Sequence, residues 1–249
     1  MSGDPMRFSW RRVGAIVGKE LRDYRRNRFV VGTMTATPLL FVTLPIIQLF
    51  LANAAASNAK LNDRIGLSLL YMLIIPVTMP SILAGYSVVG EREQGTLEPV
   101  LTTPIRSDEF LIAKALAAFA PVLVIAYAVF GVFLGAAALF AHPVIATAIY
   151  SGQHVLVQLL FTPLLAGWAI WVGIAVSTRA TDVRVAQQLA VLGSFPPLII
   201  VALMSLNVIP ESVVLAVALA AALLVFDLLA WRVVAAMFDR ERLVTGGSR

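Results

Sequence analysis

The sequence contains no cysteine and only two histidines, His142 and His154. Without cysteine there is no disulfide framework, no thiolate metal site and no cysteine nucleophile, and two histidines are too few for a histidine-built metal site. Charged residues are also scarce, at 13% of the 249 residues. A soluble domain of this length needs far more polar surface than that. We therefore expect neither a metal site nor a catalytic centre in a water-exposed fold.

Apolar residues are abundant instead, because 59% of the chain is hydrophobic. A membrane-spanning helix needs about 20 mainly apolar residues to cross a hydrocarbon core of about 30 Å. Six stretches meet this length, although a proline pair interrupts the fifth. The predicted spans are residues 29–52, 66–90, 110–140, 155–177, 185–206 and 213–234. The sequence thus predicts an all-α integral membrane protein with six transmembrane helices, built as one domain over residues 1–249.

Lysine and arginine are distributed unevenly between the two sides of these spans. Of the 19, all but Lys60 and Arg64 lie in the N-terminal leader, near the connections after the second and fourth spans, or near the C-terminus. Cytoplasmic segments carry the excess of Lys and Arg, so we predict that both termini are cytoplasmic and that the chain lies in the inner or plasma membrane. The net charge of +5 is then an orientation bias. We expect membrane lipids, and no nucleic acid, as partners of these charges.

The leader, residues 1–28, is amphipathic with helical spacing. Its apolar stripe consists of Met6, Trp10, Val13, Val17, Leu21 and Tyr24. Basic side chains fall on the opposite face. A helix of this kind lies in the membrane plane with its apolar face at the acyl boundary. We predict an N-terminal interfacial helix.

The connection between the second and third spans has the pattern of a short helix between two breaks. Gly95 ends the preceding turn, and Thr96 is a suitable N-cap. Leu97, Val100 and Leu101 follow at i, i+3 and i+4, which gives one apolar ridge. The segment is therefore predicted to be a short amphipathic helix on the cytoplasmic side.

The flanks of this segment, residues 91–109, are acidic and include Glu91, Glu93 and Glu98. One interpretation is a connector that rests on the lipid surface. Anionic headgroups would repel these three carboxylates, which favours the alternative that the ridge docks into a groove of a partner protein.

One motif in this region carries a resemblance to a known family. It reads Glu91-x-Glu93-x-Gly95-Thr96-Leu97-Glu98, followed by Thr103-Pro104, Glu109 and Lys114. This motif resembles the signature of ATP-binding cassette (ABC) type 2 exporter permeases, and the six-span layout with a basic leader extends the likeness over the chain. Ala113 departs from the pattern, since many relatives have glycine there.

The resemblance implies a permease that binds no nucleotide itself. A separate ABC ATPase subunit would bind ATP and Mg²⁺, and two permease copies, identical or paralogous, would enclose the pathway. The segment after the second span would be the coupling helix seated in the ATPase. Glu91, Glu93 and Glu98 would pair with basic ATPase residues, and Gly95 would supply the tight backbone turn. This chain would therefore not be an enzyme by itself.

Polar residues on the first, second and fifth spans are candidates for the pathway. They are Thr33, Thr37, Gln48, Ser81, Tyr86, Gln187, Gln188 and Ser194. Each of them singly is more typical of a hydrogen bond between helices. The mild polarity of the set favours a small amphipathic cargo, such as a drug-like compound or a lipid.

Three other functions remain as alternatives. A secondary transporter driven by an ion gradient would need acids near the midplane, and only Asp227 comes close, five residues before Arg232. A membrane scaffold without transport would use the same docking segment. An intramembrane protease is disfavoured because no nucleophile motif or paired aspartates occur, and His154 with Ser151 reads as a polar external loop.

Overall fold

The part of the chain that the computed structural model describes consists of helices and short connections. It comprises residues 8–51, 58–95, 105–206, 208–209 and 213–237. Within these residues, six helices are long and apolar enough to span a membrane, which confirms the predicted number. They are α2 (Arg28–Leu51), α3 (Asn58–Ser87), α6 (Ser107–Phe140), α8 (Gly152–Arg179), α9 (Val183–Ser205) and α10 (Val213–Met237). Shorter helices in the same described ranges are α1 (Trp10–Arg26), α4 (Val89–Glu93) and α7 (Pro143–Ile149).

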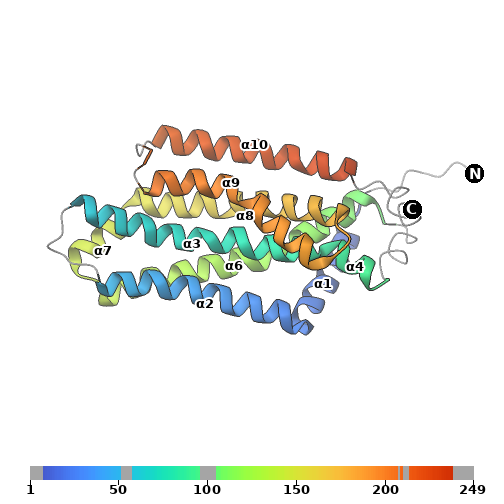
Figure 1. Ribbon diagram of the computed structural model, residues 1–249, viewed down its shortest axis with the longest axis horizontal. Coiled ribbons are helices and arrows are strands. Elements are labelled where there is room, and N and C mark those ends of the chain that lie inside the picture. The colour runs from blue at the N-terminus through green and yellow to red at the C-terminus, as the bar shows by residue number, and fades with distance from the viewer. Residues whose placement is uncertain (1–7, 52–57, 96–104, 207, 210–212, 238–249) are drawn as a thin grey trace, which may run out of the picture.

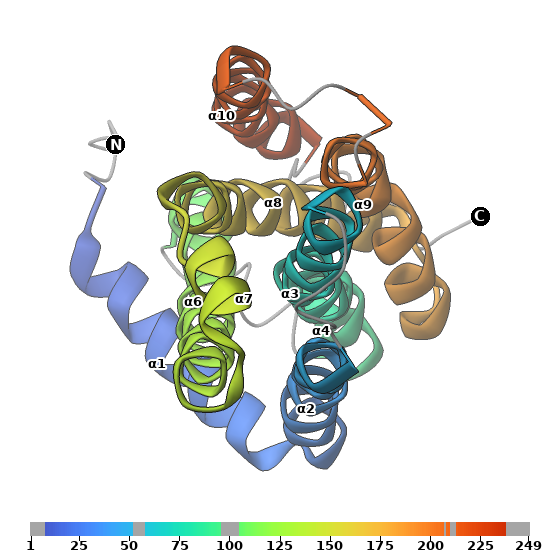
Figure 2. The same cartoon turned by 90° about the vertical axis from the view of Figure 1, so that its left-hand side faces the viewer.

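Helix α3 occupies the centre of the bundle, where it packs against α2, α6, α8 and α9 (Figure 2). Helix α10 packs mainly on α8 and exposes most of its apolar side chains, as α2 does on the opposite flank. Lipid tails are as apolar as these side chains, so outer helices of a membrane bundle lose nothing by exposing them. The bundle is therefore built for a lipid solvent.

Close backbone approach fixes the position of α3 against its neighbours. A Cβ added at Gly66 would lie 2.0 Å from the carbonyl oxygen of Ser205 in α9. A Cβ at Gly173 in α8 would lie 2.7 Å from the Cβ of Ala84. Small residues at such contacts let membrane helices approach closely enough for dense packing.

Prolines inside the spans do not end the helices, and at two of them a neighbouring helix binds the carbonyl that the proline frees. Pro197 removes the donor for the carbonyl of Gly193 in α9, and the indole of Trp168 in α8 donates to it at 3.1 Å. In the same way, the hydroxyl of Tyr127 donates at 3.0 Å to the carbonyl that Pro163 frees in α8. Such replacement partners explain why proline is tolerated in membrane bundles.

The two ends of the bundle differ. Helices α1 and α4 and the last turn of α10 lie at one end, and α7 lies at the other (Figure 1). We call these the α1 end and the α7 end. The charge distribution predicts that the α1 end is cytoplasmic.

Part of the apolar stripe of helix α1 packs on protein, whereas the sequence predicts that the stripe faces the acyl boundary. Val13 and Tyr24 are buried, and Val17 and Leu21 pack against the hydrophobic core shared with α3 and α6. Trp10 at the helix start is 68% exposed and points away from that core. In Figure 2, α1 runs alongside α6 and reaches α2. The stripe faces the bundle because the flank of α6 offers both apolar surface and charges that pair with α1.

Candidate functional site

A buried lysine joins three helices at the α1 end. Lys114 in α6 donates to Oε1 of Glu20 in α1 at 2.9 Å and to Oε1 of Glu91 in α4 at 2.8 Å. Its side chain is 1% exposed. Lys19 contacts the same two carboxylate oxygens at 3.2 and 3.0 Å. We call Lys19, Glu20, Glu91 and Lys114 the buried charge network.

The buried charge network is balanced, because two ammonium groups face two carboxylates. Burial alone would lower the pKa of Lys19, but the carboxylates of Glu20 and Glu91 raise it above its ordinary value. Removing one partner of a buried ion pair leaves an uncompensated charge, which typically costs about 3–5 kcal/mol. The network therefore holds α1, α4 and α6 together only while all its members remain.

A second ion pair fastens the start of α1 to the start of α6. Arg12 donates to both carboxylate oxygens of Glu109, from Nε at 2.8 Å and from Nη2 at 2.6 Å. The same carboxylate accepts the backbone N–H groups of Ser9 at 2.7 Å and Arg106 at 3.2 Å. Glu109 is fully buried. Bidentate charge-assisted contacts of this kind fix geometry as well as position.

Helix α4 is bound on its other side to the end of α8. The helix is interrupted between α3 and α4, and there the hydroxyl of Ser177 accepts hydrogen bonds from the backbone N–H groups of Val88 and Val89, both at 3.0 Å. Arg92 donates to the carbonyls of Thr178 and Ala180, both at 3.1 Å. A cation at these last carbonyls also matches the dipole of α8.

Glu93 extends these contacts to α9, since it accepts the N–H of Val183 at 3.1 Å. Through Arg92, Glu93 and the buried charge network, the short helix α4 contacts α1, α6, α8 and α9 within one small region. A displacement of α4 would therefore strain contacts with helices on both sides of the bundle.

The predicted coupling residues are only partly described. Thr96, Leu97, Glu98, Val100 and Leu101 lie outside the described residues. Gly95 has a φ of 68°, in the left-handed region that favours glycine, as expected of a residue that ends a turn.

The sequence predicts a basic ATPase residue as the partner of Glu91, and that pairing stays a prediction. The side chain of Glu91 is 9% exposed and bound to lysines of its own chain. Glu93 is more exposed, but its carboxylate already binds the first turn of α9.

The importance of Glu20 was missed at the sequence level, although a signal existed. Val13, Val17, Glu20 and Tyr24 recur at helical spacing, which places Glu20 on the apolar face of α1. An acid on an apolar face needs a buried partner, and Lys114 inside an apolar helix needs one as well.

The candidate pathway residues fall into two groups. In the first group, four of the eight form hydrogen bonds within or between helices: Ser81 with Ser194 at 2.8 Å, Ser68 to Gln48 at 3.2 Å, and Thr33 to its own helix at 2.9 Å. Thr37 is half-buried on α2, and Gln188 is exposed on α9. Since Ser81 and Ser194 are fully buried, they serve the contact between α3 and α9.

Tyr86 and Gln187 form the second group and line one cavity. It has a volume of about 310 Å³ and lies between α2, α3 and α9, with Phe29, Asn27 and Arg184 also on its wall. Tyr86 additionally accepts a hydrogen bond from Gln94, and Gln187 donates to the carbonyl of Ile82 at 3.3 Å. Two of the predicted pathway residues therefore lie on the wall of this cavity.

Asp227 faces α8 and does not pair with Arg232. Its Oδ1 atom is buried without a hydrogen-bond partner. Its Oδ2 atom lies 2.6 Å from where a Cβ on Gly167 would be. The absence of a side chain at Gly167 therefore makes room for this carboxyl group.

Comparison with protein families agrees with the resemblance seen in the sequence. The model of a family described as ABC-2 family transporter protein matches residues 16–196, which is most of the chain. The match includes α1 from its second turn, α4, and the helices that carry the buried charge network. A comparison with curated proteins finds no match.

Proposed function

Since this chain belongs to the ABC-2 transporter family, we propose that it is the permease subunit of an ATP-driven exporter. Two permease copies would form the pathway, and a separate ATPase subunit would bind ATP and Mg²⁺. The chain itself would supply the membrane passage and no catalytic group. Its cargo would be a small amphipathic compound, a drug or a lipid.

The observation that carries this proposal is the set of contacts around α4. The segment of residues 96–104 follows α4 directly, and in this proposal it docks into the ATPase. A push on that segment would reach α4 first. The buried charge network would pass the displacement to α1 and α6, and Arg92 and Glu93 would pass it to α8 and α9.

Space for such a motion exists beside the network. A cavity of about 550 Å³ lies between α1, α2 and α3, and Lys19, Tyr86, Glu91 and Lys114 are among the residues on its wall. Alternating access requires two states whose equilibrium the ATPase biases. In our proposal, ATP-driven closure of two ATPase subunits shifts α4 and α1 together and favours the outward-facing state.

The proposed cargo class follows from the cavity that contains Tyr86 and Gln187. Its volume of about 310 Å³ is at the lower end of the range for small-molecule sites. Aromatic and aliphatic walls, with two amides and one arginine, suit a compound with an apolar body and a polar end. A long charged polymer would require a different lining.

An efflux assay tests the proposal against its rivals. Cells that express the chain with its ATPase are loaded with a fluorescent amphiphilic dye, and dye retention is followed. We expect deletion of the chain to increase retention, and ATP depletion to have the same effect in cells that retain the chain. A protonophore applied at constant ATP should change little. Export that survives ATP depletion but fails with the protonophore would favour an ion-gradient transporter, and unchanged retention after deletion would favour a scaffold.

A further inference from the structure

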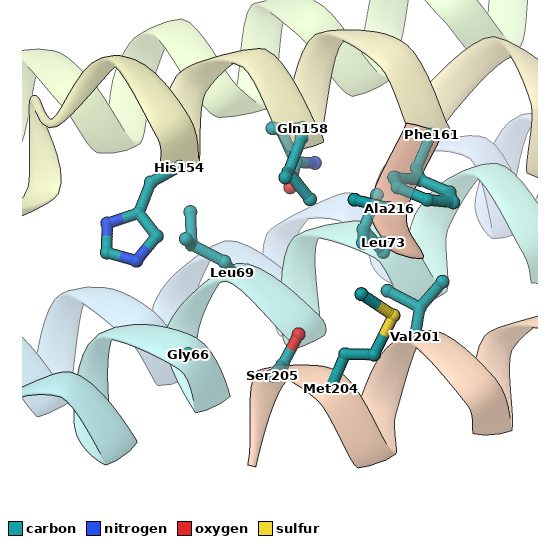
Figure 3. Close-up of a pocket in the computed structure, with 11 residues that line it drawn as sticks. Gly66, Leu69, Leu73, His154, Gln158, Phe161, Val201, Met204, Ser205 and Ala216 are labelled. Atoms are coloured by element: carbon teal, nitrogen blue, oxygen red, sulfur yellow. The ribbon is translucent and has the colours of Figure 1, made fainter. Parts of the chain in front are cut away.

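A small cavity lies near the α7 end, far from the buried charge network. It is enclosed by α3, α8, α9 and α10 and has a volume of about 50 Å³ (Figure 3). Most of its wall is apolar and includes Leu69, Leu73, Phe161, Val201 and Ala216. Among the residues that the structure describes, no Asp, Glu, Lys or Arg lines it.

Gln158 places an unpartnered acceptor at this cavity. The residue is 2% exposed, and its Oε1 atom is buried with no hydrogen-bond partner among the described residues. Figure 3 shows its side chain among the apolar lining residues on α8. Leaving a buried acceptor unpaired is unfavourable, so such a group in a native protein points to a missing donor.

His154, one turn earlier on α8, contributes a second acceptor. Its Nδ1 atom lies 3.0 Å from the carbonyl of Ala148 and 2.8 Å from the hydroxyl of Ser151. A carbonyl only accepts, so the contact with Ala148 assigns the proton to Nδ1. The Nε2 atom of the neutral ring is then an acceptor.

We propose that this cavity binds the hydroxyl group of an uncharged amphiphile, which donates its hydrogen to Oε1 of Gln158. The amide N–H groups of Gln158 and the hydroxyl of Ser205 also belong to the wall, but the unpaired group is the acceptor Oε1 of Gln158, so the ligand must bring a donor. A cation would lack a carboxylate and an anion would lack a counter-charge in this apolar surrounding. A neutral alcohol brings a hydrogen-bond donor and carries neither a positive nor a negative charge.

The size of the cavity indicates how such a ligand would lie. About 50 Å³ exceeds the share of one water molecule in the liquid, about 30 Å³, but holds only a headgroup. The first turns of α10 carry the exposed side chains of Val213, Val214 and Val217 beside Ala216 of the cavity wall. The alkyl chain would extend over this apolar surface. The inference rests on these residues alone and does not depend on the proposed exporter function.

Photolabelling with a matched pair of probes tests the proposal. The purified chain in detergent is exposed to a diazirine-bearing dodecanol or to the methyl ether of the same compound, which has the same chain but no donor. Labelled residues are mapped by mass spectrometry. We expect labelling of peptides from α8, α9 and α10 around the cavity, with the alcohol roughly three- to tenfold more efficient than the ether, the ratio that one hydrogen bond gives.

Two variants assign the preference to the site. Gln158→Leu keeps the size of the side chain and removes the acceptor, so it should make alcohol and ether label equally. Thr35→Val on the exposed face of α2 is the control and should keep the preference. Should Gln158→Leu fail to fold, competition in the unchanged chain gives the same information, because unlabelled dodecanol should displace the probe better than dodecyl methyl ether does.

The proposal would be overturned by equal labelling with both probes in the unchanged chain, or by a preference that survives in folded Gln158→Leu. Absence of labelling at the cavity by either probe would also overturn it, since water would then be the donor to Gln158.

Discussion

Lys114 is the residue on which the arrangement at the α1 end depends most. It is almost completely buried, and two carboxylates from different helices share its ammonium group. Lys19, the other cation near them, is half-exposed. Loss of Lys114 would therefore leave Glu20 and Glu91 close together with one weaker counter-charge.

Lys114→Met should destabilise the chain by about 3 kcal/mol and loosen α1, because the methylene stem remains while the charge is lost. Thermal unfolding of the purified chain in detergent, followed by tryptophan fluorescence, measures the stability. Arg22→Met on the exposed face of α1 is the control and should change stability by less than about 0.5 kcal/mol. A triple variant with Lys114→Met, Glu20→Gln and Glu91→Gln should recover part of the loss, since no fully buried charge is left unpaired and the half-exposed Lys19 keeps Asp23 at 3.5 Å. Equal stability of Lys114→Met and Arg22→Met would contradict this account.

Among the elements, the contact of α3 with α9 depends on a missing side chain. A Cβ on Gly66 would overlap the backbone carbonyl of Ser205, which cannot rotate away as a side chain can. Gly131 in α6 provides a matched comparison, because nothing lies within 4 Å of its added Cβ.

Gly66→Ala should therefore separate α3 from α9 and cost about 1–3 kcal/mol, in the range of overpacked cores. Gly131→Ala should be neutral or slightly stabilising, since alanine is the better helix former by about 1 kcal/mol. Unfolding temperatures of the two variants decide the point. If the two substitutions had the same effect, the close approach of the helices would be refuted.

The tolerance of α9 for its proline pair is a second property of an element. In our account the indole of Trp168 replaces the backbone donor that Pro197 removes from the carbonyl of Gly193. Trp168 also stacks on Phe226 with ring centroids 4.1 Å apart, so Trp168→Phe keeps an aromatic ring but loses the N–H donor.

Trp168→Phe should cost about 1 kcal/mol in the unchanged chain, the typical net contribution of one hydrogen bond. In a Pro197→Ala background the backbone donor returns, so the same substitution should cost clearly less. A double-mutant cycle over these two positions measures the coupling. If the stability effects of the two substitutions were strictly additive, the indole would not act as the replacement donor.

For the whole molecule, sequence periodicity and length were sufficient to predict six spanning helices, because hydropathy over about 20 residues is a strong local signal. The family followed from one dense motif around Glu91 and Gly95. The docking of α1 was not predictable in the same way. An amphipathic stripe looks alike whether it faces lipid or protein, and only the position of Glu20 on that stripe indicated the latter.

The candidate site was predictable in its location more than in its contacts. Residues 91–109 stood out as a polar connection, but the pairing of Glu91 with Lys114 and Lys19 joins segments that are distant along the chain. Ser81 and Ser194 bind each other, but the sequence alone could not distinguish them from residues that line a pathway. Three-dimensional packing decides both questions.

The central claim is that this chain works together with a separate ATPase that contacts the segment after α4. The most direct measurement is purification of the tagged chain in mild detergent, with quantitative mass spectrometry of the proteins that accompany it. We predict a stoichiometric ATP-binding subunit that is lost in the double variant Leu97→Asp and Leu101→Asp and retained in Gln188→Leu. Purification of a folded chain without any ATPase, under several mild conditions, would contradict the account.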